Sequence, residues 1–228
     1  MDVLLITGMW LTGSAWDKVT PELERLGHRP VALTLPGQGA APADATLDDQ
    51  VKAVLDAVDA AAGPVVVVGH SAASSLAWIA ADARPDKVAR TVLVGGFPTP
   101  DGQRYFGYVE PVDGLIHFPG WEEFAGPDSD DMDDATLQAA ADQMVPVPIS
   151  VVHGLVSLRD PRRFDVPCTL VCPEFSVEQA KEWVATDEAT TELQRSNALE
   201  YVDIDSGHWP MFSKPVEFAA LLDQVIRS

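Results

Sequence analysis

The sequence predicts an α/β fold: a mostly parallel, doubly wound sheet of about six strands. Short apolar runs rich in β-branched residues alternate with longer stretches of helical periodicity, and the runs lack the polar alternation of a half-exposed strand. Strands of this kind are covered by helices on both faces of the sheet. The predicted strands span residues 3–7, 30–34, 65–69, 91–95, 169–172 and 199–204.

Length, composition and charge indicate the number of domains and the kind of partner. The 228 residues are 46% apolar, which suits one domain with one sizeable core. The net charge of −20 repels phosphate backbones and anionic lipids, so we expect a small-molecule partner and neither nucleic acid nor membrane. The N-terminus, MDVLLITGMW, is acidic where a secretory signal would be basic, which favours a cytoplasmic protein. The oligomeric state is not indicated.

Three predicted helices have recognisable ends. Thr46 and Asp49 form a capping box before an apolar stripe at helical spacing, and we expect this helix to pack on the sheet. Pro215 stands at the first position of an amphipathic helix that closes the fold. Gly27 ends a short helix before the strand at 30–34.

The segment from about residue 98 to 167 interrupts the alternation of strands and helices. It is rich in Pro, Gly and acidic residues and has a helical stretch at 135–144. Because it is inserted between two strands, we expect a lid over the carboxyl edge of the sheet, where ligands usually bind. Its acidic run, GPDSDDMDD at 126–134, is expected to be a solvated loop.

Two cysteines, Cys168 and Cys172, lie four residues apart in one predicted strand. Their side chains would share a face about 13 Å apart, too far for a disulfide. No His or Cys stands close by in sequence to complete a metal site. We expect both to be buried apolar side chains.

The stretch VVVVGHSAASSLAW, residues 65–78, places Ser71 between a buried strand and a helix. A nucleophile elbow, G-x-S-x-G, needs this context, because the tight turn strains the serine and requires small neighbours. Ala73 stands at the last glycine position and adds one methyl group to the turn. The pentapeptide alone is weak evidence, since similar ones are common by chance.

Two further stretches strengthen the prediction. In DSGHWPMF, His208 lies in a turn 137 residues after Ser71, at the same carboxyl edge of the sheet. A serine hydroxyl needs such an imidazole to take its proton. The stretch ITGMWLTGSAW, residues 6–16, follows the first strand, and the main-chain N–H groups of Met9 and Ala72 would form the oxyanion hole.

Together these stretches resemble the α/β-hydrolase fold superfamily along essentially the whole chain. The matching motifs are TGMW at 7–10, LPGQG at 35–39, GHSAA at 69–73 and SGHWP at 206–210. The chain is most similar to compact esterase-like members that begin at the oxyanion strand. Thr7 replaces a common histidine of the family, which leaves the backbone donor in place. The resemblance implies that an Asp or Glu after the next-to-last strand orients His208.

The identity of that carboxylate is open at this point. The relevant stretch, PCTLVCPEFSVEQ at 167–179, has no aspartate, and Glu174 is its nearest carboxylate. We favour Glu174, because it follows the strand next to that of His208. Asp101 is the alternative, although it would have to fold back from a turn that holds Pro98 and Pro100. A Ser–His dyad is the third interpretation.

Several aromatic residues are candidates to line a substrate cleft. Trp10, Phe97 and Tyr105 are the predicted substrate-binding residues, with Phe106 and Trp121 beside them. Of the remaining histidines, His70 is expected to point into the sheet packing, and His28 and His117 are expected to be surface or loop residues.

The function predicted from these observations is that of a serine hydrolase for a small carboxylic ester or lactone. Ser71 would be the nucleophile, His208 the base and acid, and Glu174 the orienting carboxylate. No metal or organic cofactor is implied. One alternative is a member of the fold with lyase, cyclase or carbon–carbon bond chemistry, since fold does not fix reaction. The other is a small-molecule-binding protein without catalysis.

Overall fold

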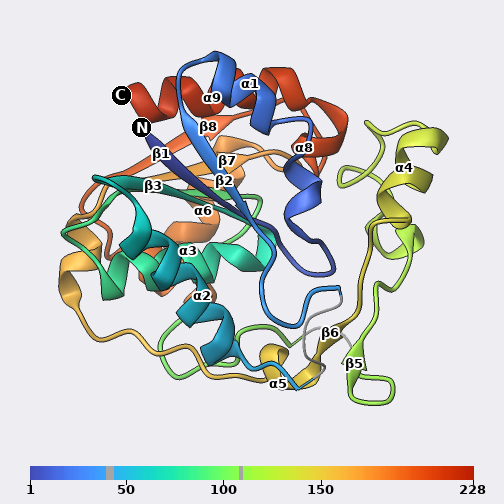
Figure 1. Ribbon diagram of the computed structural model, residues 1–228, viewed down its shortest axis with the longest axis horizontal. Helices are drawn as coiled ribbons and strands as arrows, with labels where there is room; N and C mark the ends of the chain where they lie inside the picture. Colours follow the sequence, from blue (N-terminus) through green and yellow to red (C-terminus); the bar gives the residue numbers. More distant parts are fainter. Residues whose placement is uncertain (40–43, 108–109) are drawn as a thin grey trace.

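The computed structural model describes residues 1–39, 44–107 and 110–228. Its main sheet has six parallel strands in the order β2–β1–β3–β4–β7–β8 (Figure 1). They are β1 (Asp2–Ile6), β2 (Arg29–Leu33), β3 (Val65–His70), β4 (Val88–Val94), β7 (Cys168–Cys172) and β8 (Leu199–Asp203). The predicted doubly wound sheet is confirmed, and each predicted strand overlaps an observed one.

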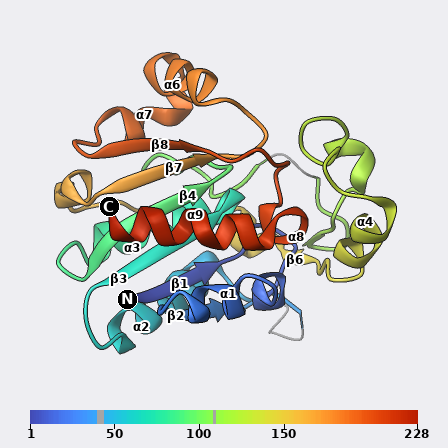
Figure 2. The ribbon, with the colours of Figure 1, turned by 90° about the horizontal axis from the view of Figure 1, so that it is seen from above.

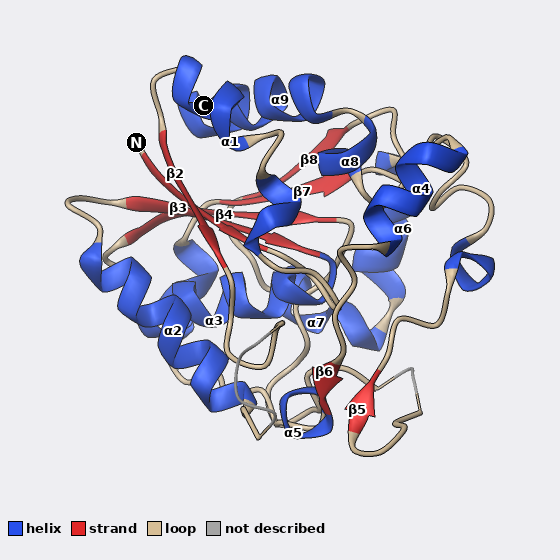
Figure 3. Ribbon diagram, turned by 45° about the vertical axis from the view of Figure 1, so that its right-hand side comes forward, coloured by secondary structure: helices blue, strands red, loops and turns tan. Residues whose placement is uncertain are grey.

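Helices cover both faces of this sheet (Figure 3). The helices α1 (Thr20–Arg25) and α9 (Pro215–Arg227) pack on one face. The helices α2 (Leu47–Ala60), α3 (Ser74–Ala83) and α6 (Val177–Thr186) pack on the other. In β3, Val66 and Val68 point to the first face and Val65 and Val67 to the second. Burial on both faces explains why this strand has no polar alternation.

The helix ends follow the expected chemistry. Both hydrogen bonds of the Thr46–Asp49 capping box are present at the start of α2, and Pro215 begins α9. Gly27 has a φ of 91° just after α1, a conformation that favours glycine. His28 lies in the loop between α1 and β2, but it is buried rather than at the surface, and its Nε2 donates to Oδ1 of Asp223 on α9 at 2.7 Å.

Between β4 and β7, the described residues of the segment 95–167 form little regular structure. They contain β5 (Leu115–Ile116), α4 (Asp134–Ala141), β6 (Val147–Pro148) and α5 (Ile149–Val152), and β5 and β6 pair as a small antiparallel sheet. Figure 2 shows α4 beyond the carboxyl ends of the strands. The main chain also reaches the loop after β1, because the N–H of Val145 donates to the carbonyl of Trp10 at 2.7 Å.

The acidic run at 126–134 differs from the expected solvated loop. Ser129 and Met132 are buried, and the carbonyl of Asp128 accepts a 2.8 Å hydrogen bond from the N–H of His208. The run therefore packs against the loop that follows β8. Its acidic composition concealed this, because the hydrogen bond is made by the main chain and the buried side chain of Met132 belongs to the same apolar cluster as Trp209.

A buried ion cluster fixes the end of the 95–167 segment. The guanidinium of Arg163 lies 3.0 Å from Asp82 on α3 and 2.8 Å from Glu192 in the short helix α7 (Thr191–Gln194). All three side chains are buried. Removing one partner of such a cluster leaves an uncompensated buried charge, so we infer that these contacts hold the segment to the sheet domain.

Cys168 and Cys172 are both fully buried and unpaired in β7, as predicted. Burial is the main cause that raises the pKa of each thiol to about 12. The two thiols are therefore protonated at neutral pH.

Candidate active site

Ser71 occupies a strained turn between β3 and α3. Its φ is 54°, in the left-handed region that non-glycine residues rarely adopt. Gly69 makes the turn sterically feasible, because a Cβ there would lie 2.3 Å from the carbonyl oxygen of Ala73. Ala73 itself has an ordinary φ of −67° and is fully buried, so an alanine fits where G-x-S-x-G has glycine. The turn projects the serine from the carboxyl end of the sheet.

The loop after β1 lies directly against this turn. A Cβ on Gly8 would lie 2.8 Å from the Cβ of Ser71, so only glycine permits the approach. The next residue is Met9. Its main-chain N–H donates no hydrogen bond to the backbone of another described residue. The N–H of Ala72 belongs to the first turn of a helix, where such groups lack intrahelical partners. Met9 and Ala72 thus stay the predicted oxyanion donors.

His208 and Glu174 come together from the loops after β8 and β7. The Nδ1 of His208 donates to Oε1 of Glu174 at 2.6 Å. The alternative carboxylate, Asp101, instead accepts the N–H of Leu158 at 2.8 Å. In the part of the chain that is described, the Nε2 of His208 has no hydrogen-bond partner. His208 thus has one ring nitrogen held by a carboxylate and the other available for proton transfer.

The electrostatics of His208 are set by competing effects. Burial alone would lower its pKa, but the charge and hydrogen bond of Glu174 and the charge of Asp128 together raise the pKa above its ordinary value of 6.5. Burial also raises the pKa of Asp128, aided by the charge of Glu174. Carboxylates at this site therefore stabilise the imidazolium form, which a general base must adopt after taking a proton.

His70, beside Ser71, is buried as expected and supports His208. Its Nε2 donates to the carbonyl of His208 at 2.8 Å, and the two ring centroids are 4.9 Å apart. Burial, with the charge of His208 as a second cause, lowers the pKa of His70 to about 3. His70 is thus neutral at working pH and does not add charge to the site.

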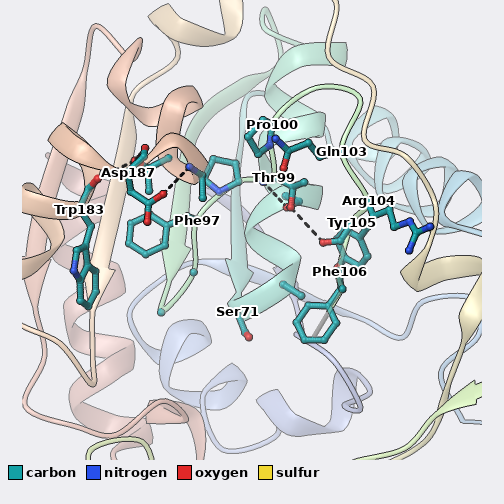
Figure 4. A pocket seen from close by; sticks show the side chains of 18 residues that line it. Ser71, Phe97, Thr99, Pro100, Gln103, Arg104, Tyr105, Phe106, Trp183 and Asp187 are labelled. Carbon is teal, nitrogen blue, oxygen red and sulfur yellow. Dashed lines mark hydrogen bonds between the residues drawn. The ribbon is translucent and has the colours of Figure 1, made fainter. Parts of the chain in front are cut away.

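Two cavities meet at Ser71. The first, which we call the His208 cavity, has a volume of about 500 Å³ and is lined by Ser71, His208, Trp10 and Trp209 among others. The second, the Phe97 cavity, has a volume of about 620 Å³ and includes Phe97 and Tyr105 (Figure 4). Each predicted substrate-binding residue thus lines a cavity: Trp10 lines the His208 cavity, and Phe97 and Tyr105 line the Phe97 cavity. Trp121 lines neither of them, and its Nε1 donates to the carbonyl of Leu137.

Sequence reasoning missed several residues of the site. Phe124 and Trp209 line the His208 cavity, and their ring centroids are 5.2 Å apart. Phe124 gave no local signal, because it reaches the cavity from a segment without regular periodicity. Trp209 could have been found from its place next to His208. The close approach at Gly8 was also missed, although the glycine stands within the TGMW motif.

A strand–serine–helix turn, backed by a histidine and a carboxylate from later loops, is typical of α/β-hydrolases. The sequence matches the model of the Alpha/beta hydrolase family over residues 3–221, and the chain therefore belongs to that family.

Curated relatives with similar sequences bear esterase and lipase names. The lipase LipV of Mycobacterium tuberculosis is 28% identical over 243 residues, covering 96% of this chain and 91% of the relative. Methylesterase 7 of Arabidopsis thaliana is 26% identical over 253 residues, covering 97% and 95%.

Solved structures show the same fold. An extracellular α/β-hydrolase from a Paenibacillus species, described as sharing structural and functional homology with tobacco salicylic acid binding protein 2, matches with a TM-score of 0.79. The match covers 98% of each chain at 20% identity, so it bears on the fold alone.

Two features are absent from the described residues. No three or more His, Cys, Asp and Glu side chains among them gather as a metal site would. None of the helices within the described ranges is long and apolar enough to span a membrane.

Proposed function

We propose that the protein is a serine hydrolase that cleaves carboxylic esters. The observation that carries the proposal is the combination of the strained Ser71 turn with the His208–Glu174 hydrogen bond at the same cavity. The esterase and lipase names of relatives with similar sequences support the same reaction class. Lactones are esters closed into a ring, so the same chemistry would open them.

In the proposed reaction, the Oγ of Ser71 attacks the acyl carbon while its proton passes to Nε2 of His208. The main-chain N–H groups of Met9 and Ala72 stabilise the negative charge on the former carbonyl oxygen. The bond from carbon to the alcohol oxygen then breaks, and His208 returns the proton to that oxygen, which releases the alcohol. Glu174 holds the imidazole in the required orientation and stabilises its charged form.

Water completes the reaction. His208 takes a proton from water as the water oxygen attacks the acyl carbon. The bond to the Oγ of Ser71 then breaks, the serine regains the proton, and the carboxylic acid leaves. One ester and one water thus give one acid and one alcohol.

A fluorophosphonate probe tests this proposal, because only an activated serine reacts with it. We expect labelling of the wild-type protein and none of Ser71→Ala, with turnover of short-chain aryl esters reduced on the order of 10⁴-fold or more. Ser157→Ala, a change at an exposed serine, is the matched control and should retain both properties. Wild-type protein that is neither labelled nor active on esters would overturn the proposal. The same holds if Ser71→Ala keeps its activity.

A further inference from the structure

Resting on the hydrolase function proposed above, we propose that the two cavities at Ser71 bind the two halves of the ester separately. The His208 cavity takes the alcohol half, and the Phe97 cavity takes the acyl half. The substrate class is therefore an ester with a bulky group on both sides of the carbonyl.

The direction of proton transfer decides which half lies where. The departing alcohol oxygen must receive its proton from Nε2 of His208, so the alcohol must lie on the His208 side of Ser71. His208 lines the first cavity and is not among the described residues that line the second. The acyl carbon remains on Ser71 after the alcohol leaves, so the acyl chain extends into the other cavity.

The shared lining residues indicate that an ester can occupy both cavities at once. Ser71 and Phe106 belong to both linings. Met9 lines the His208 cavity and Ala72 lines the Phe97 cavity, so the two oxyanion donors come from opposite sides of the scissile bond. An ester carbonyl held between these donors would direct one substituent into each cavity.

The volumes argue against a very small group on either side. At about 500 and 620 Å³, both cavities fall within the range that holds drug-sized ligands, about 300–1,000 Å³. The methyl group of a methyl ester would leave most of the His208 cavity unfilled. An alcohol with an aromatic ring would instead bury its apolar surface against the aromatic lining.

The chemistry of the His208 cavity suits an aromatic or cationic alcohol. The ring centroid of Phe124 lies 6.0 Å from that of Trp10 and 5.2 Å from that of Trp209. Glu110 and Glu123 are its acidic lining residues, and none of the described lining residues is Lys or Arg. Aromatic faces and carboxylates both favour positive charge, so an anionic alcohol should be disfavoured.

The Phe97 cavity offers a different surface. Phe97 and Trp183 meet edge to face at 6.3 Å on one wall, and Figure 4 places them across the cavity from Tyr105 and Phe106. The hydroxyls of Ser75 and Thr99 are 3.0 Å apart and bond to each other, so they are already satisfied. The cavity also has two charged lining residues, Arg104 and Asp187. Its aromatic surface suits the apolar part of the acyl group.

The test separates acylation from deacylation. Esters that share an acyl group but differ in alcohol form the same acyl-enzyme, whose hydrolysis no longer involves the alcohol. Burst kinetics therefore measure the two steps independently. The matched variants are Phe124→Ala, in the His208 cavity, and Trp183→Ala, in the Phe97 cavity.

For Phe124→Ala we expect kcat/KM for arylmethyl esters to fall about tenfold or more, a smaller change for methyl esters, and a deacylation rate within about twofold of wild type. For Trp183→Ala we expect the loss of kcat/KM to grow with the size of the acyl group, and we expect the deacylation rate to fall as well. The milder Phe124→Leu, with thermal unfolding as a check, covers the case in which Phe124→Ala does not fold.

A charge series adds a second measurement. Among alcohols of equal size, a quaternary ammonium or neutral alcohol should be preferred to a carboxylate, and Glu123→Gln should reduce the preference for the cation.

Three outcomes would overturn the inference while leaving the hydrolase function intact. The first is a slower deacylation in Phe124→Ala. The second is a loss of kcat/KM that follows acyl size in Phe124→Ala and alcohol size in Trp183→Ala. The third is a loss of kcat/KM that depends equally on both halves of the ester in both variants. Wild-type protein that cleaves none of the esters would defeat the proposed function itself, and this assignment with it.

Discussion

The Oε1 of Glu174 and the Nδ1 of His208 lie 2.6 Å apart, although 34 residues separate them in the sequence. The pair forms because β7 and β8 are neighbouring parallel strands and both residues follow the ends of these strands. The carboxylate can therefore orient the ring and stabilise its positive charge, whereas Asp101 is engaged with Leu158.

Replacing Glu174 by Gln should lower ester turnover steeply, by about 10³- to 10⁴-fold, because the shape is kept and the charge that stabilises the imidazolium is lost. Asp101→Asn is the matched control, since its remaining side-chain oxygen can still accept the N–H of Leu158. Steady-state kinetics on one aryl ester compare the two. If Asp101→Asn were the more damaging change, the assignment of the carboxylate would fail.

The pH profile should report the raised pKa of His208. The base works only when neutral, so kcat/KM should rise with pH through a midpoint above 6.5, the ordinary value for histidine. Glu174→Gln and Asp128→Asn each remove a charge that raises this pKa, so each should move the midpoint to lower pH. The measurement is the pH dependence of kcat/KM, or of the labelling rate by the probe. A midpoint that neither variant moves would contradict the assigned cause.

Met9 is expected to act through its main chain. Met9→Pro removes the N–H group and should reduce turnover roughly 100- to 1000-fold, the usual effect of one lost oxyanion donor. Met9→Leu keeps the N–H and nearly conserves the volume of this buried side chain, so its activity should stay within a few-fold of wild type. Equal losses in the two variants would show that the side chain, and not the donor, is required.

His70 should make stability depend on pH with the opposite sign to a paired histidine. Its pKa is about 3 in the folded protein and about 6.5 in an unfolded chain, so the unfolded state binds the extra proton. Its contribution to stability is present above pH 6.5 and is lost as the pH falls, by roughly 2 kcal/mol at pH 5. His70→Gln should remove this part of the pH dependence in urea unfolding. If the free energy of unfolding changed with pH in the same way in wild type and His70→Gln, this role of His70 would be refuted.

The sequence predicted what depends on local chemistry and on the sheet. The strand runs, the Thr46 cap and the positions of Ser71 and His208 follow from patterns within a few residues, and the parallel sheet then brings the strand ends together. Glu174 could be preferred over Asp101 on the same ground. The methyl group that Ala73 adds to the elbow is accommodated, because the φ of Ala73 is an ordinary one.

What the sequence could not predict depends on distant contacts in irregular chain. His28 pairs with Asp223, 195 residues away, and nothing local marks it as buried. The acidic run packs on the His208 loop through the carbonyl of Asp128, an atom that every residue carries. Phe124 faces the His208 cavity from a segment with no period from which a face could be assigned.

The burial of Cys168 and Cys172 has a practical consequence for spectroscopy. These are the two cysteines of the sequence, and both thiols lie inside the core with a pKa of about 12. A maleimide dye should therefore ignore the natural chain and react with a cysteine introduced at the surface, for example by Val112→Cys, where the valine is 59% exposed. A second dye could be attached at a cysteine introduced next to the main six-stranded sheet. Fluorescence energy transfer between the two dyes would then follow the position of Val112→Cys during turnover, with both native thiols in place.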